Sequence, residues 1–194
     1  IYFTGPTGSG KTTTLYSVLQ YLSSRLVNIV TIEDPVERNL PKINQIQVND
    51  RAGLNFQTGL RSILRQDPDI IMIGETREQE TAEISARAAI TGHLVFSTLH
   101  TNDAASSVTR LMDMGIPAYL AAASIAGIVS QRLMRKVCPY CQEEYEARPE
   151  ELKILYGKPA APGEHVRLRR GKGCYLCNET GYKGRIAIHE ILSV

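Results

Sequence analysis

The sequence predicts an α/β fold with a mainly parallel sheet, and two observations carry this expectation. Short apolar runs bounded by Gly, Pro, Asp or Glu have the character of buried parallel strands; they are Ile1–Thr4, Ile29–Ile32, Ile70–Ile73 and Leu94–Ser97. Each run is followed by a segment with helical spacing of apolar residues: Lys11–Ser24, Phe56–Leu64, Thr81–Ile90 and Ala104–Met114. Alternation of strands and helices implies a parallel sheet with right-handed crossovers.

Composition bounds the class of protein. The 194 residues are 43% apolar and 22% charged, which suits one globular domain with a small appendage. The net charge of +2 gives no support to nucleic acid binding. No apolar run approaches the roughly 20 residues of a membrane span, so we expect no direct membrane insertion. Because the chain opens on Ile1 without a start methionine, we expect it to be part of a longer protein.

The texture of the sequence changes after Arg135, which predicts two domains, 1–135 and 136–194. In the first, Ile43–Val48 alternates apolar and polar residues and predicts an edge strand or an extended loop. In the second, we expect a helix in the acidic segment Glu143–Glu151, a linker at Gly157–Gly163 and a final strand around Ile186–Leu192.

A phosphate-binding motif joins the first predicted strand to the first helix. The run Gly5–Thr12 matches the pattern G-x-x-x-x-G-K-[ST] in full, in the strand–helix context that the motif requires. Glycines let backbone N–H groups curl around phosphates, and the helix N-terminus adds positive potential. We expect Lys11 at the β- and γ-phosphates and Thr12 at Mg²⁺. The complete set of predicted nucleotide-binding residues is Gly5, Pro6, Thr7, Gly8, Ser9, Gly10, Lys11, Thr12 and Thr13.

Carboxylates at strand ends are candidates to complete this site. Glu33 and Asp34 follow the second strand and precede Pro35, and Glu75 ends the run Ile70–Glu75. Ligands of parallel sheets lie off the carboxyl ends of the strands, so the acids of both strand ends are expected near the phosphates. At either strand end they could instead be ordinary solvated loop residues.

Two histidines bracket the predicted strand Leu94–Ser97. His100 lies just past its end, where it could sense a γ-phosphate, and His93 precedes it and is a possible charge-stabilising residue. Arg61 and Arg65 share one helix face and could stabilise charge, either with the acids or on a neighbouring subunit's nucleotide. A structural role for His93 and surface ion pairing for the arginines are the alternatives.

All the cysteines of the chain lie in two C-x-x-C pairs, Cys138 with Cys141 and Cys174 with Cys177. Four thiolates make a tetrahedral Zn²⁺ site with no position open to water, so the predicted zinc is structural. Disulfides and free buried thiols are the alternatives, and a reducing compartment disfavours disulfides.

Together these motifs resemble the secretion ATPase superfamily, and within it the type II secretion and type IV pilus assembly ATPases (the GspE/PilB group). The stretches that carry the resemblance are Gly5–Thr12, Thr31–Glu37, Leu60–Asp69, Ile73–Glu75 and Gly92–Thr101. The family usually continues Gly-Glu-Ile-Arg-Asp where this chain has Thr76 and Glu78 in place of the Ile and the Asp.

The resemblance implies a RecA-like P-loop NTPase core that hydrolyses ATP with Mg²⁺. It implies Glu33 as the water-activating acid, Glu75 at the Mg²⁺ side with Thr12, and His100 near the γ-phosphate. It also implies a cytoplasmic homo-hexamer, peripheral on the inner face of the cell membrane, that docks on an inner-membrane platform and cytoplasmic adaptor proteins. The tetracysteine site favours assembly or secretion over retraction. A nucleic acid motor and a non-catalytic ATP-binding scaffold are the alternatives; three Phe and no Trp weigh against the first.

Overall fold

The computed structural model describes residues 1–157 and 165–194. The chain divides into two compact units, and the strands β6 and β9 belong to both. The first unit is Ile1–Arg132 with Ala187–Val194, and the second is Leu133–Ile186. The expected domains, 1–135 and 136–194, differ from these units mainly at the end of the chain, where residues 187–194 pack with the first unit.

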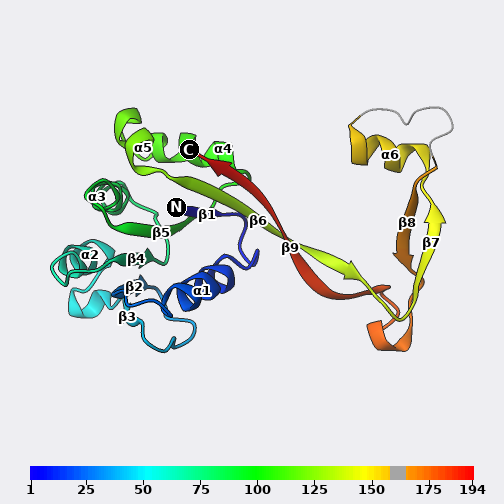
Figure 1. Ribbon diagram of the computed structural model, residues 1–194, viewed down its shortest axis with the longest axis horizontal. Helices are drawn as coiled ribbons and strands as arrows, with labels where there is room; N and C mark the ends of the chain where they lie inside the picture. The colour runs from blue at the N-terminus through cyan, green and yellow to red at the C-terminus, as the bar shows by residue number, and fades with distance from the viewer. Residues whose placement is uncertain (158–164) are drawn as a thin grey trace. The chain divides into compact units, whose positions relative to one another are not determined.

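A sheet of seven strands, within the described part of the chain, is the frame of the first unit (Figure 1). Its order is β3-β2-β4-β5-β1-β6-β9, and neighbouring strands from β3 to β6 run parallel. The strands are β1 (Tyr2–Thr4), β2 (Ile29–Glu33), β3 (Asn44–Gln47), β4 (Ile70–Ile73), β5 (Leu94–Leu99), β6 (Gly127–Val137) and β9 (Tyr182–Ser193). β9 runs antiparallel to β6. The Val194 N–H donates to the Ala126 carbonyl and His189 contacts Gln131, so later residues of β9 lie beside earlier residues of β6.

Helices cover both faces of this sheet. They are α1 (Lys11–Leu22), α2 (Phe56–Ile63), α3 (Gln79–Ile90), α4 (Ala104–Asp113) and α5 (Ala118–Ser124). Strand side chains alternate between faces: in β4, Ile70 and Met72 pack with α1, whereas Ile71 and Ile73 pack with α2 and α3. Figure 1 shows α1 on one side of the sheet and α2, α3 and α5 on the other. Among the described residues, none of the helices is long and apolar enough to cross a membrane.

The second unit holds a two-stranded antiparallel ribbon. Strand β7 (Gln142–Glu146) pairs with β8 (Arg167–Gly171), and helix α6 (Pro149–Tyr156) follows β7. A short 3₁₀ turn (Tyr175–Cys177) follows Cys174 and ends at Cys177. Glutamates of β7 pair with arginines of β8, as in the 2.9 Å contact of Glu143 with Arg170.

Most of the expected elements of the first unit are confirmed, including an edge strand, β3, within Ile43–Val48. The helix expected over Glu143–Glu151 is wrong in its first half. Residues 142–146 form β7, because the basic residues of β8 lie opposite the glutamates and compensate their charge. Gly157 ends α6, and the rest of the expected linker, 158–163, lies outside the described residues.

Candidate nucleotide site and metal centre

The loop between β1 and α1 is held in a conformation that only glycine adopts easily. Gly5 has φ of 139°, and a Cβ atom there would lie 2.3 Å from the backbone oxygen of Gln131 on β6. Gly10, with φ of 83°, precedes α1, whose first turn has no capping side chain and no acidic residue. The uncapped N–H groups of α1 are therefore free for an anion.

Lys11 is folded back onto this loop. Its side chain is buried, and Nζ donates to the carbonyl oxygens of Gly5 (2.8 Å) and Pro6 (3.2 Å). Burial lowers the pKa of Lys11, while the charge of Glu75 opposes that shift. The ammonium group thus lies inside the loop, within the electrostatic reach of Glu75, the acid that follows β4.

One buried atom of the loop supports a phosphate ligand directly. Ser9 is only 4% exposed, and its Oγ has no hydrogen-bond partner among the residues that the structure describes. Buried hydroxyls are nearly always bonded, so an orphaned one facing a glycine loop is a fit for an oxygen-rich ligand. Of the other predicted loop residues, Pro6, Thr7, Gly8 and Thr13 are exposed and Thr12 is half-buried. These residues fit the phosphates of a nucleotide.

Glu75 lies at the end of β4, next to this loop, in a small charged cluster. Its carboxylate contacts Arg77 at 2.6 Å and His100 Nε2 at 3.0 Å. Burial alone would raise the pKa of Glu75, but the hydrogen bond from Arg77 and the charges of His100, Arg77 and Lys11 lower it overall. Glu75 is therefore ionised at neutral pH and faces the lysine of the phosphate loop.

The departures from the family pattern beside Glu75 are accommodated locally. Thr76 is buried, and its hydroxyl bonds the Ser97 hydroxyl at 2.7 Å. Glu78 precedes α3 and accepts a hydrogen bond from Gln57 on α2. Arg77 keeps its contact with Glu75, so neither substitution displaces the acid from the cluster.

Glu33 lies in a different environment from Glu75. It is 2% exposed at the end of β2, and three side chains donate to its carboxylate. The donors are the hydroxyl of Tyr16 on α1, Thr31 Oγ1 (2.5 Å) and Gln45 Nε2 (3.1 Å). The structure therefore brings together Lys11, Glu75 and His100, and it holds Glu33 in a separate buried network.

The remaining predicted residues lie apart from the phosphate loop in this chain. His93 precedes β5, at the opposite end of that strand from His100, and its Nδ1 lies 3.0 Å from the Ala88 carbonyl. Arg61 pairs with Glu80 at 2.8 Å on an exposed face, and Arg65 contacts Ser62.

Two residues of the site were not predicted. Tyr16 bonds Glu33, and Gln131 on β6 bonds the carbonyl of Ser9 at 2.6 Å. A tyrosine within a helical pattern and a glutamine beside an apolar run carry no local signal, since each acts on a residue far away in sequence.

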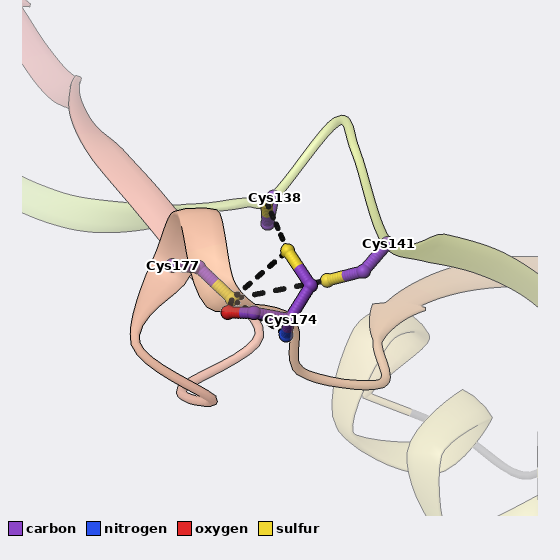
Figure 2. Close-up of side chains that lie close together, drawn as sticks. All are labelled: Cys138, Cys141, Cys174 and Cys177. Carbon is purple, nitrogen blue, oxygen red and sulfur yellow. Dashed lines mark hydrogen bonds between the residues drawn. The ribbon is translucent and has the colours of Figure 1, made fainter.

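The four cysteines come together in the second unit, as Figure 2 shows. All their sulfur atoms lie within 4.8 Å of one another. Neighbouring sulfurs are 4.0 Å apart (Cys138 and Cys174), 3.9 Å apart (Cys141 and Cys177) and 3.7 Å apart (Cys174 and Cys177). Four thiolates at about 2.3 Å from one Zn²⁺ lie about 3.8 Å from each other. A disulfide needs sulfurs about 2.05 Å apart, so the geometry fits a metal and not a disulfide.

Hydrogen bonds from the backbone favour the thiolate of one cysteine in particular. Burial opposes ionisation of Cys177, but the N–H groups of Cys174 (3.2 Å) and Gly181 (3.3 Å) donate to its sulfur and lower its pKa to about 6. Burial raises the pKa of Cys141 to about 12 and also raises that of Cys174, so the fit to Zn²⁺ rests on the positions of the four sulfur atoms.

A mainly parallel sheet with a glycine loop entering its first helix, and with an acid at the end of another parallel strand of the same sheet, defines a P-loop NTPase fold. The chain belongs to the type II/IV secretion system protein family, whose family model matches residues 1–194. The resemblance stated from the motifs is thereby confirmed.

Curated relatives and solved structures agree on this family. The chain is 53% identical over 194 residues to the type II secretion system ATPase E of Vibrio cholerae and 54% identical over 191 residues to the type IV pilus assembly ATPase PilB of Thermus thermophilus. These matches cover 100% and 98% of the chain, but only 38% and 21% of the two relatives. The pilus retraction motor PilT with bound ADP aligns with a TM-score of 0.66 at 41% identity, over 71% of this chain and 43% of that one. The Legionella pneumophila ATPase DotB aligns with a TM-score of 0.60 at 29% identity, over 87% of this chain and 43% of that one. The expected RecA-like P-loop fold is thus confirmed.

Proposed function

We propose that this chain is the ATP-hydrolysing core of a motor that assembles a type IV pilus or a type II secretion pseudopilus. The observation that carries the proposal is the loop with a buried lysine and an unpartnered Ser9 hydroxyl, next to the ionised Glu75. The names of the relatives support a role in assembly or secretion, since they include secretion and pilus assembly ATPases.

The residues divide the chemistry as follows. Lys11 leaves the carbonyls of Gly5 and Pro6 to bond the phosphates, and Ser9 and the N–H groups of the loop hold the same chain of oxygens. Thr12 and Glu75 are the candidate ligands of Mg²⁺, which supplies charge neutralisation at the phosphates when bound. His100, bonded to Glu75, lies on the exposed side of the cluster, where a γ-phosphate would be sensed.

Glu33 remains a candidate for water activation, and its network sets a condition on that role. The carboxylate is 2% exposed and accepts three hydrogen bonds, which leave one of its roughly four acceptor positions, so water reaches it only if the surrounding side chains move. If the donors stay in place, Glu33 positions the loop after β2 and Glu75 is the acid nearest the reaction.

We extend the proposal to the assembly. We infer a homo-hexamer at the cytoplasmic face of the cell membrane, docked on an inner-membrane platform and adaptor proteins, in which Arg61 and Arg65 act on the nucleotide of a neighbouring subunit. The exposure of both arginines supports a role outside their own subunit. The four cysteines would hold one structural Zn²⁺.

Steady-state ATPase assays test the proposal. They require a protein that carries this chain together with the further residues that its relatives have. We expect Lys11→Ala and Glu75→Gln each to lower kcat by about a hundredfold or more, since each 1.4 kcal/mol of barrier is tenfold. Glu83→Gln, at a half-buried acid of α3 that pairs with Arg87, is the control and should leave turnover unchanged.

The same assay separates the two candidate acids. A loss in Glu33→Gln as deep as in Glu75→Gln, with nucleotide affinity retained, would assign water activation to Glu33. Turnover in Lys11→Ala and Glu75→Gln equal to that of the wild type would remove the proposed reaction.

A further inference from the structure

Gln131 is a buried polar residue in contact with both ends of the phosphate loop. It lies on β6, is 1% exposed, and donates from Nε2 to the carbonyl of Ser9 at 2.6 Å. Its Oε1 accepts from Thr14 Oγ1 of α1 at 2.8 Å. Its backbone oxygen lies against Gly5, where the loop begins.

The hydrogen bonds fix which way the Gln131 amide points. The Ser9 carbonyl can only accept, so the Gln131 nitrogen lies at Ser9, and the Gln131 oxygen accepts from the hydroxyl of Thr14, which can donate or accept. The same oxygen lies 3.0 Å from His189 Nε2 on β9. Because the Gln131 oxygen can only accept, His189 must carry its proton on Nε2.

This orientation acts on the loop through one peptide bond. In a trans peptide the C=O and the N–H point in opposite directions. A Ser9 carbonyl turned toward Gln131 therefore turns the N–H of Gly10 away from it, to the other side of the loop. The N–H groups on that side of a phosphate loop are those that meet the phosphates.

We propose that Gln131, held by Thr14 and His189, is a positioning residue that sets the phosphate loop for its ligand. This inference rests on the proposed nucleotide-binding function. It predicts that loss of the Gln131 amide weakens binding of the β-phosphate in particular, because the adenine and ribose do not depend on the Ser9–Gly10 peptide.

The test compares ADP with AMP, two ligands that differ by the β-phosphate. Dissociation constants would be measured by competition with a fluorescent nucleotide, on a protein that carries this chain together with the further residues of its relatives. We expect Gln131→Met, which keeps the length of the side chain, to weaken ADP binding by about tenfold or more, because it removes the hydrogen bonds to Ser9, Thr14 and His189. AMP affinity should change less than about twofold. Gln20→Met, the same change at an exposed position of α1, is the control.

Two further variants keep the test decisive if Gln131→Met folds poorly. Gln131→Glu keeps an acceptor for Thr14 but sets an oxygen against the Ser9 carbonyl, so ADP should weaken at least as much. Thr14→Val removes one bond and should weaken ADP by about threefold, following the value of one hydrogen bond. Equal losses for ADP and AMP, or ADP binding unchanged in all three variants, would overturn the positioning role. If the wild type bound ADP no better than Lys11→Ala, the proposed function itself would fall, and the inference with it.

Discussion

Replacing Tyr16 by Phe tests the buried network around Glu33, because it removes one hydroxyl and keeps the ring in the core. The hydroxyl donates to the Glu33 carboxylate and accepts the N–H of Glu37 at 3.2 Å. A hydrogen bond to a charged group contributes about 1.5–3 kcal/mol, and we expect a loss of stability of that size.

The ionisation of Tyr16 adds a pH dependence to this prediction. Burial, followed by the hydrogen bond and the charge of Glu33, raises its pKa from 10.0 to about 12. Because the folded state holds this proton more tightly, the stabilisation is complete below pH 10 and is lost as the pH rises from 10 toward 12.

Urea unfolding at pH 8 and pH 11 measures both effects. We expect the free energy of unfolding of the wild type to exceed that of Tyr16→Phe by about 2 kcal/mol at pH 8. The difference should be distinctly smaller at pH 11, because only the wild type has a titrating hydroxyl at position 16. Tyr21→Phe, at an exposed position of the same helix, should cost almost nothing at either pH. A Tyr16→Phe cost below about 0.5 kcal/mol, the usual range for surface changes, with no narrowing at pH 11, would refute the buried network.

Other positions give equally definite expectations. Gly5→Ala should cost about 2 kcal/mol or more, because its Cβ meets the Gln131 backbone, whereas Gly53→Ala, with positive φ and open space, should cost less in the same thermal unfolding assay; equal costs would contradict the close approach. Metal analysis should find one Zn²⁺ per chain, lost in Cys177→Ser, and chelation should lower the unfolding temperature of the wild type alone; full zinc content in the variant would rule out this ligand set. Arg77→Ala should raise the pKa of Glu75. As the pH falls, the stability contributed by ionised Glu75 should then be lost at a higher pH than in the wild type. If the titration of Glu75 followed by NMR did not move in the variant, the Arg77 contact would be excluded as a cause of the lowered pKa.

The sequence was most informative where structure is local. The phosphate loop has fixed spacing, and the strand Ile70–Ile73 is a run of four buried apolar residues, so both could be predicted. The strand position of Glu33 was also predictable. Its burial was not, because the donors Tyr16 and Gln45 come from α1 and β3.

Long-range pairing explains the misses. The acidic sequence of β7 alone predicts a helix. In the fold it forms a strand, because arginines of β8 lie opposite its glutamates. β6 continues from a core segment into an exposed strand without a change of period, so its role in carrying Gln131 to the loop has no signature. Charge compensation and side-chain contacts between distant segments depend on the topology of the fold, so they cannot be predicted from the sequence pattern of either segment.

We propose above all that the loop from Gly5 to Thr12 binds a nucleotide through its phosphates, with Glu75 beside it. A crystal structure of the protein with Mg²⁺ and a non-hydrolysable ATP analogue would test it most directly. We predict that Lys11 Nζ leaves the carbonyls of Gly5 and Pro6 for the phosphate oxygens, that Ser9 Oγ gains a partner there, and that Glu75 lies on the metal side. A nucleotide bound elsewhere, with Lys11 still bonded to the two carbonyls, would contradict the account.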